Sequence, residues 1–164
     1  MGTGGIGGYF GGLLARAGHD VTFVARGQHL EAIVEAGLTV ESSNKGDFTV
    51  GCKATDSPDG SDTPELLIFS VKMYQNQEAI ELIKPSVGPD TTILSIQNGI
   101  DNGHLLSQAF GYDNVMIGSA FVEGRIKAPG IISQGGPGIA AFGEQFIGLT
   151  ERGRTLNQIF ENAG

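Results

Sequence analysis

The chain has 164 residues, of which 40% are hydrophobic and 17% charged, a composition typical of one globular domain rather than a disordered chain. Ten basic and eighteen acidic residues give a formal net charge of −8, which disfavours nonspecific binding to nucleic-acid phosphates. The apolar runs are too short for a membrane-spanning helix, and the single cysteine, Cys52, excludes an internal disulfide. We therefore expect a cytoplasmic protein without a nucleic-acid or membrane partner.

Apolar residues along the chain follow two alternating patterns. Between Gly5 and Ala17 they recur every three to four positions, which predicts an amphipathic helix, and the β-branched run at 20–25 is typical of a buried strand. In chain order the sequence predicts a helix at 5–17, a strand at 20–25, a helix at 28–37, a hairpin at 38–52, a loop at 55–64, a strand at 65–72, a helix at 76–84, a strand at 91–99, a helix at 103–111, short strands at 115–122, 130–134 and 139–142, and a helix at 150–164. Strands that alternate with helices pair in parallel through right-handed crossovers. We therefore expect an α/β fold with a doubly wound, mainly parallel sheet and helices on both faces.

Three glycines at the start of the first predicted helix have the spacing GxGxxG, at Gly2, Gly4 and Gly7. In a dinucleotide-binding turn the first glycine makes the sharp turn, the second lets backbone amides approach a pyrophosphate, and the third lets the helix pack close to the sheet. The helix N-terminus adds a positive dipole. The motif alone is weak in a chain with 27 glycines, but the helix that begins inside it and the strand that follows favour a Rossmann-like domain.

The next strand ends at Arg26, about where a dinucleotide fold recognises the adenosine ribose. An acidic residue there would accept a hydrogen bond from the ribose 2′-hydroxyl and repel a 2′-phosphate. An arginine instead offers a planar fork to the phosphate and a face that stacks on adenine. Arg26 therefore favours NADP(H) over NAD(H), with a solvated charge at the start of a helix as the alternative.

The segment before the glycine turn is short, because only Met1 precedes Gly2. A strand normally leads into such a turn and lies at the centre of the sheet. We therefore expect the sheet to lack its first central strand, either because Met1 is an internal methionine taken as a start or because the chain is trimmed.

Three stretches in this order carry a resemblance to a known family: GTGGIGGYFGGLLARAGHDVTFVAR at 2–26, SVKMYQ at 70–75 and SIQNGID at 95–101. The chain resembles, from Gly2 to about Glu144, the N-terminal domain of the ketopantoate reductase (2-dehydropantoate 2-reductase) family. The resemblance implies that residues 1–164 form the N-terminal NADP-binding Rossmann-type domain, truncated at both ends, with the family's helical C-terminal domain absent. That family reduces the 2-keto acid 2-dehydropantoate to pantoate with NADPH, on the way to pantothenate and coenzyme A.

The resemblance also implies roles for single residues. The pyrophosphate would be held by the turn made of Gly2, Thr3, Gly4, Gly5, Ile6 and Gly7. Arg26 would bind the 2′-phosphate, Lys72 would lie beside the cofactor, Asn98 would sit where nicotinamide and substrate meet, and a backbone contact would come from near Gly124. The family's proton donor is a lysine of the helical domain, so this chain alone is expected to turn over no 2-dehydropantoate. Whether the protein forms a homodimer through that helical domain is left open.

Lys72 and Asn98 each follow a predicted buried strand, at the carboxyl end where ligands of open α/β sheets gather. The alternatives are a surface lysine at the start of a loop and a turn residue in the dipeptide Asn-Gly. His29 and His104 are not assigned to catalysis, Cys52 is expected to be structural, and no Cys/His cluster has metal-ligand spacing.

Other functions share part of this pattern. A reductase of another 2-keto acid would share every motif, because the missing domain mainly sets substrate shape. A noncatalytic NADPH-binding or sensor module would keep the glycines and Arg26 without needing Lys72 and Asn98, and a purely structural fragment would bind no cofactor. Lys72 and Asn98 together favour the enzyme.

Overall fold

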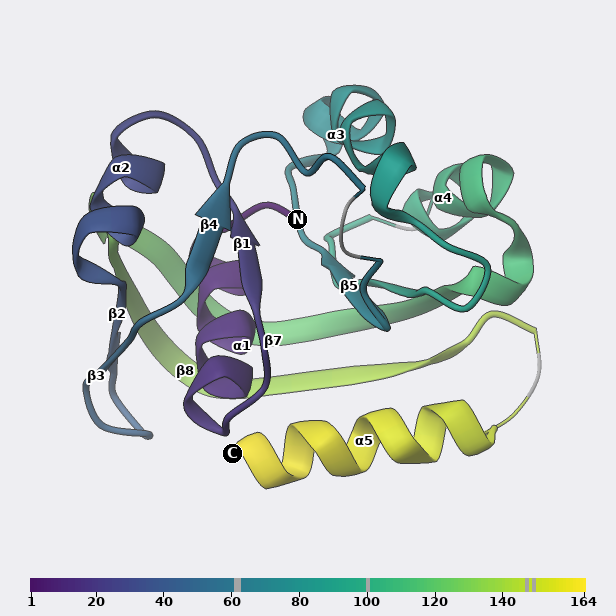
Figure 1. Cartoon of the computed structure of the whole chain (residues 1–164). Helices are drawn as coiled ribbons and strands as arrows, with labels where there is room; N and C mark the ends of the chain where they lie inside the picture. Colours follow the sequence, from purple (N-terminus) through teal and green to yellow (C-terminus); the bar gives the residue numbers. More distant parts are fainter. Residues whose placement is uncertain (61–62, 100, 147, 149) are drawn as a thin grey trace.

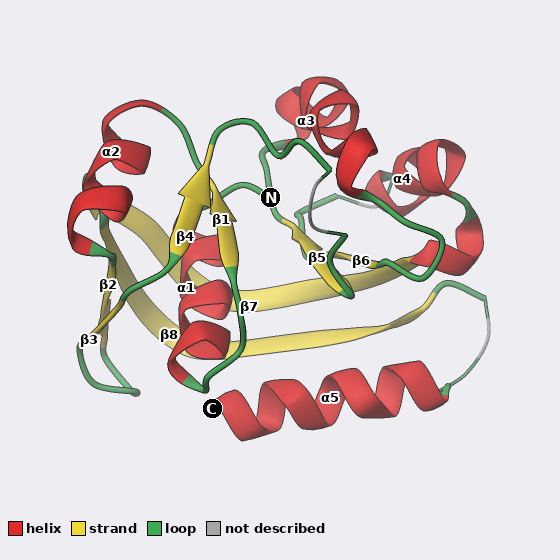
Figure 2. Ribbon diagram, viewed as in Figure 1, coloured by secondary structure: helices red, strands yellow, loops and turns green. Residues whose placement is uncertain are grey.

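A computed structural model describes residues 1–164 except 61–62, 100, 147 and 149. Figure 1 shows the chain and Figure 2 its secondary structure. The elements are α1 (Gly5–Arg16), β1 (Thr22–Val24), α2 (Gly27–Ala36), β2 (Leu38–Ser42), β3 (Phe48–Val50), β4 (Lys53–Thr55), β5 (Leu66–Phe69), α3 (Asn76–Ile83), β6 (Thr92–Ser95), α4 (Asn102–Phe110), β7 (Val115–Ala128), β8 (Ile131–Glu144) and α5 (Glu151–Ala163), with 3-10 turns at Met73–Gln75, Lys84–Ser86 and Tyr112–Asn114.

The strands of the described residues form two sheets. Six strands lie in the order β3-β2-β8-β7-β6-β5, and β1 pairs with β4 in a separate two-stranded sheet. The pairs β1–β4, β2–β8, β5–β6 and β6–β7 are parallel, whereas β2–β3 and β7–β8 are antiparallel. The expected α/β fold with a mainly parallel sheet is therefore confirmed.

Alternate residues of the central strands face two separate cores, as strand geometry requires. On β6, Leu94 packs into the core that contains residues of α1 and α5, whereas Ile93 packs into the core that contains residues of α3 and α4. On β7, Met116 and Val115 divide in the same way. Helices therefore cover both faces, as expected.

A gap separates the two sheets, and Met1–Thr3 lies in it (Figure 1). On one side the Met1 amino group donates to the Ile68 carbonyl at 2.7 Å, and the Ser70 N–H donates to the Met1 carbonyl at 3.1 Å. On the other side the Thr3 N–H donates to the Val24 carbonyl at 3.1 Å. β1 and β5 do not pair with each other, as expected for a sheet without its central strand, and the start of the glycine turn is held between them.

The long hairpin of β7 and β8 corrects the sequence prediction of three short strands at 115–122, 130–134 and 139–142. The glycines that suggested breaks are accommodated inside the strands. Gly118 is in close contact with the partner strand, since a Cβ there would lie 2.8 Å from the Ala141 carbonyl oxygen. Gly136 and Gly138 have φ of 70° beside the register shift between Phe121 and Glu123, so they form an irregularity that the hairpin absorbs.

β4 was not predicted as a strand. It has three residues and pairs in parallel with β1, more than twenty-five positions earlier in the chain, at Thr22↔Lys53 and Val24↔Thr55. Asp56 is the first residue after β4 and therefore lies at the edge where Arg26 follows β1.

Among the described residues, no helix is both long and apolar enough to cross a membrane.

Candidate functional site

The strands β1, β5 and β6 end around one cavity of about 1150 Å³. Arg26 lies two residues beyond β1, Lys72 three beyond β5 and Asn98 three beyond β6, and all three line this cavity together with the glycine turn. This is the position at which open α/β sheets bind ligands. The structure therefore brings the three side chains that the sequence singled out to one edge of the sheet.

The glycine turn has the geometry that each glycine of the motif predicts. Gly2 has φ of +88°, and a Cβ there would lie 2.8 Å from Val71 Cγ1. A Cβ at Gly7 would lie 2.4 Å from the Gly2 carbonyl oxygen, so the helix can approach the turn only with glycine at this position. A Cβ at Gly4 would meet nothing within 4 Å, and Gly4 lines the cavity.

This arrangement fits a phosphate group. The backbone of the turn faces open space at Gly4, and α1 begins at the next residue. The first N–H groups of a helix have no acceptor within the helix, and the aligned peptide dipoles favour an anion at this end. The first turn of α1 carries no acidic residue that would repel such an anion.

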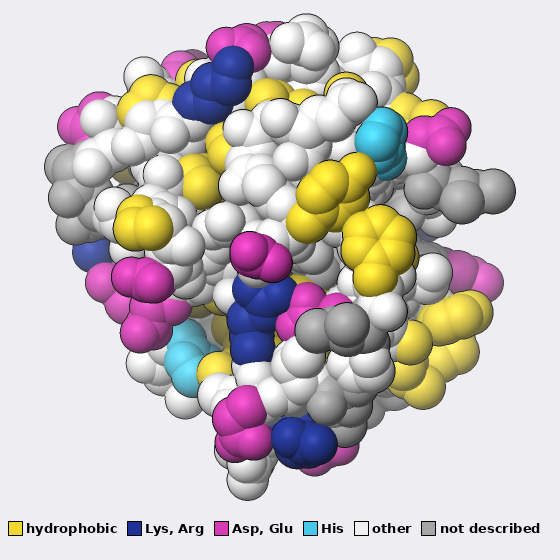
Figure 3. All heavy atoms as spheres, turned by 90° about the vertical axis from the view of Figure 1, so that its right-hand side faces the viewer, with side chains coloured by type: hydrophobic (Ala, Val, Ile, Leu, Met, Phe, Trp, Pro, Cys, Tyr) yellow, Lys and Arg dark blue, Asp and Glu magenta, His cyan; other side chains and the backbone are white. Residues whose placement is uncertain are grey.

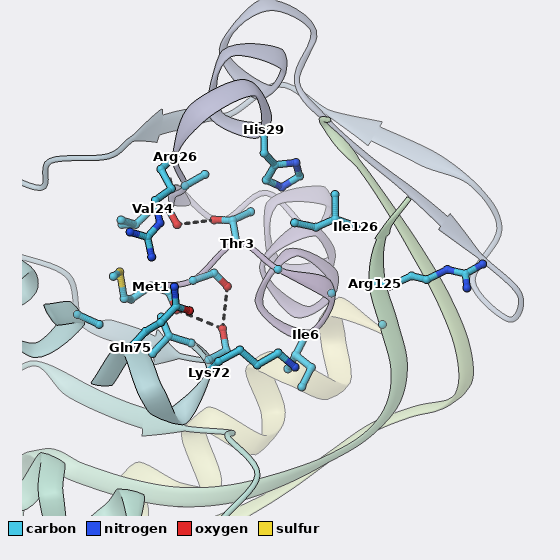
Figure 4. A pocket seen from close by; sticks show the side chains of 18 of the residues that line it. Met1, Thr3, Ile6, Val24, Arg26, His29, Lys72, Gln75, Arg125 and Ile126 are labelled. Atoms are coloured by element: carbon cyan, nitrogen blue, oxygen red, sulfur yellow. Dashed lines mark hydrogen bonds between the residues drawn. The ribbon is translucent and has the colours of Figure 1, made fainter. Parts of the chain in front are cut away.

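Two hydroxyl groups fix the turn to the strands on either side (Figure 4). Thr3 Oγ1 donates to the Val24 carbonyl at 3.0 Å, and Ser70 Oγ donates to the Gly2 carbonyl at 3.0 Å. Thr3 is buried, so its side chain supports the turn rather than a ligand. The turn is thus attached to both β1 and β5.

Gly5 and Gly124 bring β7 against the start of α1. A Cβ on Gly5 would lie 2.0 Å from the Gly124 carbonyl carbon, and a Cβ on Gly124 would lie 2.5 Å from the Gly5 carbonyl oxygen. Both residues line the cavity. The sequence-based expectation of a backbone contact near Gly124 thus concerns a residue that lies directly beside the glycine turn.

Arg26 and Glu78 both line the cavity and form an ion pair. Arg26 is the N-cap of α2 with extended backbone, φ −145° and ψ 161°, and Glu78 lies in the first turn of α3. Arg26 Nη1 is 3.0 Å from Glu78 Oε1, and the two side chains are 62% and 68% exposed. An exposed ion pair of this kind contributes about 1 kcal/mol or less, so a ligand can displace it.

A network of buried amides holds the strand ends that carry Lys72 and Asn98. Gln97 Nε2 donates to the Val71 carbonyl at 2.6 Å and to Asn76 Oδ1 at 2.7 Å. Asn76 Nδ2 donates to Asn102 Oδ1 at 2.8 Å, and Asn102 Nδ2 donates to the Asn98 carbonyl at 2.9 Å. Gln97, Asn76 and Asn102 are buried. The backbone at Asn98 is thereby fixed while its side chain stays exposed.

The pKa of His29, which lines the cavity, is lowered from its ordinary value. Burial is the main cause of this shift. His29 Nδ1 accepts a hydrogen bond from the Gly130 N–H at 2.9 Å, so the proton lies on Nε2. Nε2 is buried without a partner among the described residues, near the glycine turn in Figure 4. The lysine and arginine residues that line the cavity are Arg26, Lys72 and Arg125.

The residues considered in the sequence analysis either line the cavity or lie outside it. Of the positions expected to hold the cofactor, all but Gly7 line the cavity: Gly2, Thr3, Gly4, Gly5, Ile6, Arg26, Lys72, Asn98 and Gly124. Gly7 lies behind the turn, where it allows close packing. His104 is exposed and bonded to Tyr112 and Gln108, and half-buried Cys52 packs against the core.

Sequence reasoning missed Gln75 and Glu78, which also line the cavity. The signal was available, because Gln75 is the N-cap of α3 and Glu78 lies in its first turn, a few residues after Lys72 and the carboxyl end of β5. The Arg125 side chain, by contrast, extends away from the other labelled side chains in Figure 4, although the residue borders the cavity.

Charges of both signs are mixed on the surface. Among the described residues on the face in Figure 3, Asp and Glu side chains lie among Lys and Arg side chains without an extended basic patch. The cavity itself is bordered by Arg26, Lys72 and Arg125 as well as by the acidic residues Asp56, Glu78, Glu81 and Glu123. Among the described residues, no group of three or more His, Cys, Asp or Glu could hold a metal ion.

Comparison with known proteins agrees with this geometry. The family model described as "Ketopantoate reductase PanE/ApbA" matches residues 1–145. A 2-dehydropantoate 2-reductase of Pyrococcus horikoshii is 36% identical over 165 residues, which covers 100% of this chain and 52% of that protein. The chain thus spans about half the length of the curated relatives it matches.

Solved structures show the same architecture. The crystal structure of 2-dehydropantoate 2-reductase from Geobacter metallireducens superposes with a TM-score of 0.93 at 36% identity, covering 100% of this chain and 54% of that one. A ternary structure of D-mandelate dehydrogenase with NADH and anilino(oxo)acetate has a TM-score of 0.90 at 22% identity, covering 99% of this chain and 53% of that one. The second likeness concerns the fold alone.

Proposed function

The chain belongs to the ketopantoate reductase family, and on this basis we propose that it is the NADPH-binding part of a 2-dehydropantoate 2-reductase. In this proposal the enzyme reduces 2-dehydropantoate to (R)-pantoate by hydride transfer in pantothenate biosynthesis, in the cytoplasm. Residues 1–164 form the dinucleotide domain, and a helical domain completes the substrate site and the dimer. The observation that carries the proposal is the cavity at which the glycine turn, Arg26, Lys72 and Asn98 meet.

The residues of the cavity have separate tasks in this proposal. The amides at the start of α1 bind the pyrophosphate, and the space at Gly4 admits it. The Arg26 guanidinium binds the 2′-phosphate through charge-assisted hydrogen bonds. Lys72, which is exposed at the end of β5, supplies a second positive charge beside the phosphates. The family resemblance supports these assignments residue by residue.

Asn98 has the central position for chemistry. Its side-chain amide can donate to a ketone or carboxamide oxygen and accept from a second group, and the network of Gln97, Asn76 and Asn102 fixes its backbone. The reduced nicotinamide supplies the hydride when the cofactor is bound. Negative charge then develops on the substrate oxygen, which requires a donor placed against it.

That proton donor is assigned to the helical domain, so this chain is expected to bind NADPH without reducing 2-dehydropantoate. The quenching or enhancement of NADPH fluorescence measures binding, and the absorbance at 340 nm after addition of 2-dehydropantoate measures turnover. Saturable binding without turnover is the expected result. Absence of NADPH binding would favour a structural fragment, and turnover dependent on 2-dehydropantoate would contradict the assignment of the proton donor.

A further inference from the structure

We propose that Glu78 sets the coenzyme selectivity of the cavity, by competing with the ribose 2′-phosphate for the Arg26 guanidinium. The inference rests on the proposed function, because it takes Arg26 as the residue that binds the 2′-phosphate. It gives Glu78 a role in coenzyme selectivity. It also predicts that this chain discriminates less between NADPH and NADH than it would if Arg26 had no competing carboxylate.

The geometry places the carboxylate where it can compete. Glu78 Oε1 lies 3.0 Å from Arg26 Nη1, and both residues line the same cavity. The side chains of Arg26 and Glu78 are 62% and 68% exposed, so neither is locked in place by packing. The two residues are 52 positions apart in sequence, at the N-cap of α2 and in the first turn of α3. The contact therefore joins two separate elements rather than stabilising one helix.

The charges explain the direction of the effect. A 2′-phosphate carries between about one and two negative charges near pH 7, and it must displace the Glu78 carboxylate from the guanidinium to bind Arg26. NADH has a hydroxyl at this position, which can donate a hydrogen bond to a carboxylate. Glu78 therefore weakens the binding of NADPH and leaves the binding of NADH unchanged or slightly stronger.

The same helix provides a matched control. Glu81 also borders the cavity, one turn along α3 from Glu78, but its carboxylate pairs with Lys84 Nζ at 2.5 Å. Glu81→Gln therefore makes the same change in net charge without touching Arg26. It separates the local competition from a general effect of removing one negative charge.

The test is the dissociation constant of the chain for NADPH and for NADH in the wild type, Glu78→Gln, Glu81→Gln, Arg26→Ala and the double variant of Arg26→Ala with Glu78→Gln. We expect Glu78→Gln to tighten NADPH binding about fivefold, the size of an exposed ion pair, with a change of less than about twofold for NADH. Glu81→Gln should leave the ratio of the two constants unchanged. In the Arg26→Ala background, Glu78→Gln should have no effect on NADPH.

The outcomes separate this inference from the proposed function. If Arg26→Ala weakens NADPH binding but Glu78→Gln leaves the NADPH-to-NADH ratio unchanged or shifts it toward NADH, the role of Glu78 is refuted and the proposed function stands. If Arg26→Ala leaves NADPH binding unchanged, or the wild type binds neither coenzyme, both are refuted. The melting temperature of each variant verifies that the folded chain is being compared.

Discussion

Gly4→Val is expected to abolish NADPH binding while the chain remains folded. Gly4 has φ −93° and ψ −161°, which any L-amino acid can adopt, and a Cβ there meets no atom within 4 Å. The two methyl groups of valine would instead fill the space beside the amides of α1 where the pyrophosphate is placed. A loss of roughly 100-fold in affinity, or about 2.7 kcal/mol, is expected.

Titration of NADPH fluorescence together with thermal unfolding measures both parts of this prediction. Gly51→Val is the matched control, because a Cβ at Gly51 also meets nothing within 4 Å and this residue lies outside the cavity. The control should bind NADPH like the wild type. Gly7→Val should instead destabilise the fold, since its Cβ would lie 2.4 Å from the Gly2 carbonyl oxygen. Wild-type affinity in Gly4→Val would show that the pyrophosphate lies elsewhere.

Arg26→Asp is expected to reverse the coenzyme preference. The variant loses the guanidinium that binds the 2′-phosphate and gains a carboxylate that repels it, so NADPH affinity should fall roughly 100-fold. NADH should be affected less than about threefold, because its 2′-hydroxyl can donate to the new carboxylate. Aspartate is also a favoured N-cap residue, and Arg26 is the N-cap of α2. The variant should therefore fold as well as the wild type.

Calorimetric titration with the two coenzymes measures this change. Arg125→Asp is a suitable control, because it makes the same change of charge at a residue that borders the cavity but whose side chain extends away from the other labelled side chains in Figure 4. The control should keep the wild-type preference. Equal losses for NADPH and NADH in Arg26→Asp would instead assign Arg26 a role in folding.

The sequence predicted best the features that depend on local patterns. The spacing of apolar residues placed α1, and the order of strands and helices gave the parallel sheet. The positions of Arg26, Lys72 and Asn98 followed from one rule, that ligands gather at the carboxyl ends of parallel strands. These three residues line one cavity in the structure.

The features that sequence reasoning missed depend on contacts between distant residues. β4 has three residues and is a strand because it pairs with β1, which no local pattern indicates. The glycines of β7 and β8 suggested breaks, yet Gly124 is required in the middle of β7 by the backbone of Gly5. Glu78 was read only as a helix residue, because its contact with Arg26 spans 52 positions.

The most direct test of the account follows the nitrogen resonances of the chain by NMR during titration with NADPH and then with NADH. The account predicts that both coenzymes shift the backbone amides from Gly2 to Ile6, and that only NADPH shifts the Arg26 Nε resonance strongly. An Arg26 Nε resonance that responds equally to both coenzymes, or shifts confined to residues outside the cavity, would contradict the claim that the glycine turn and Arg26 together bind NADPH.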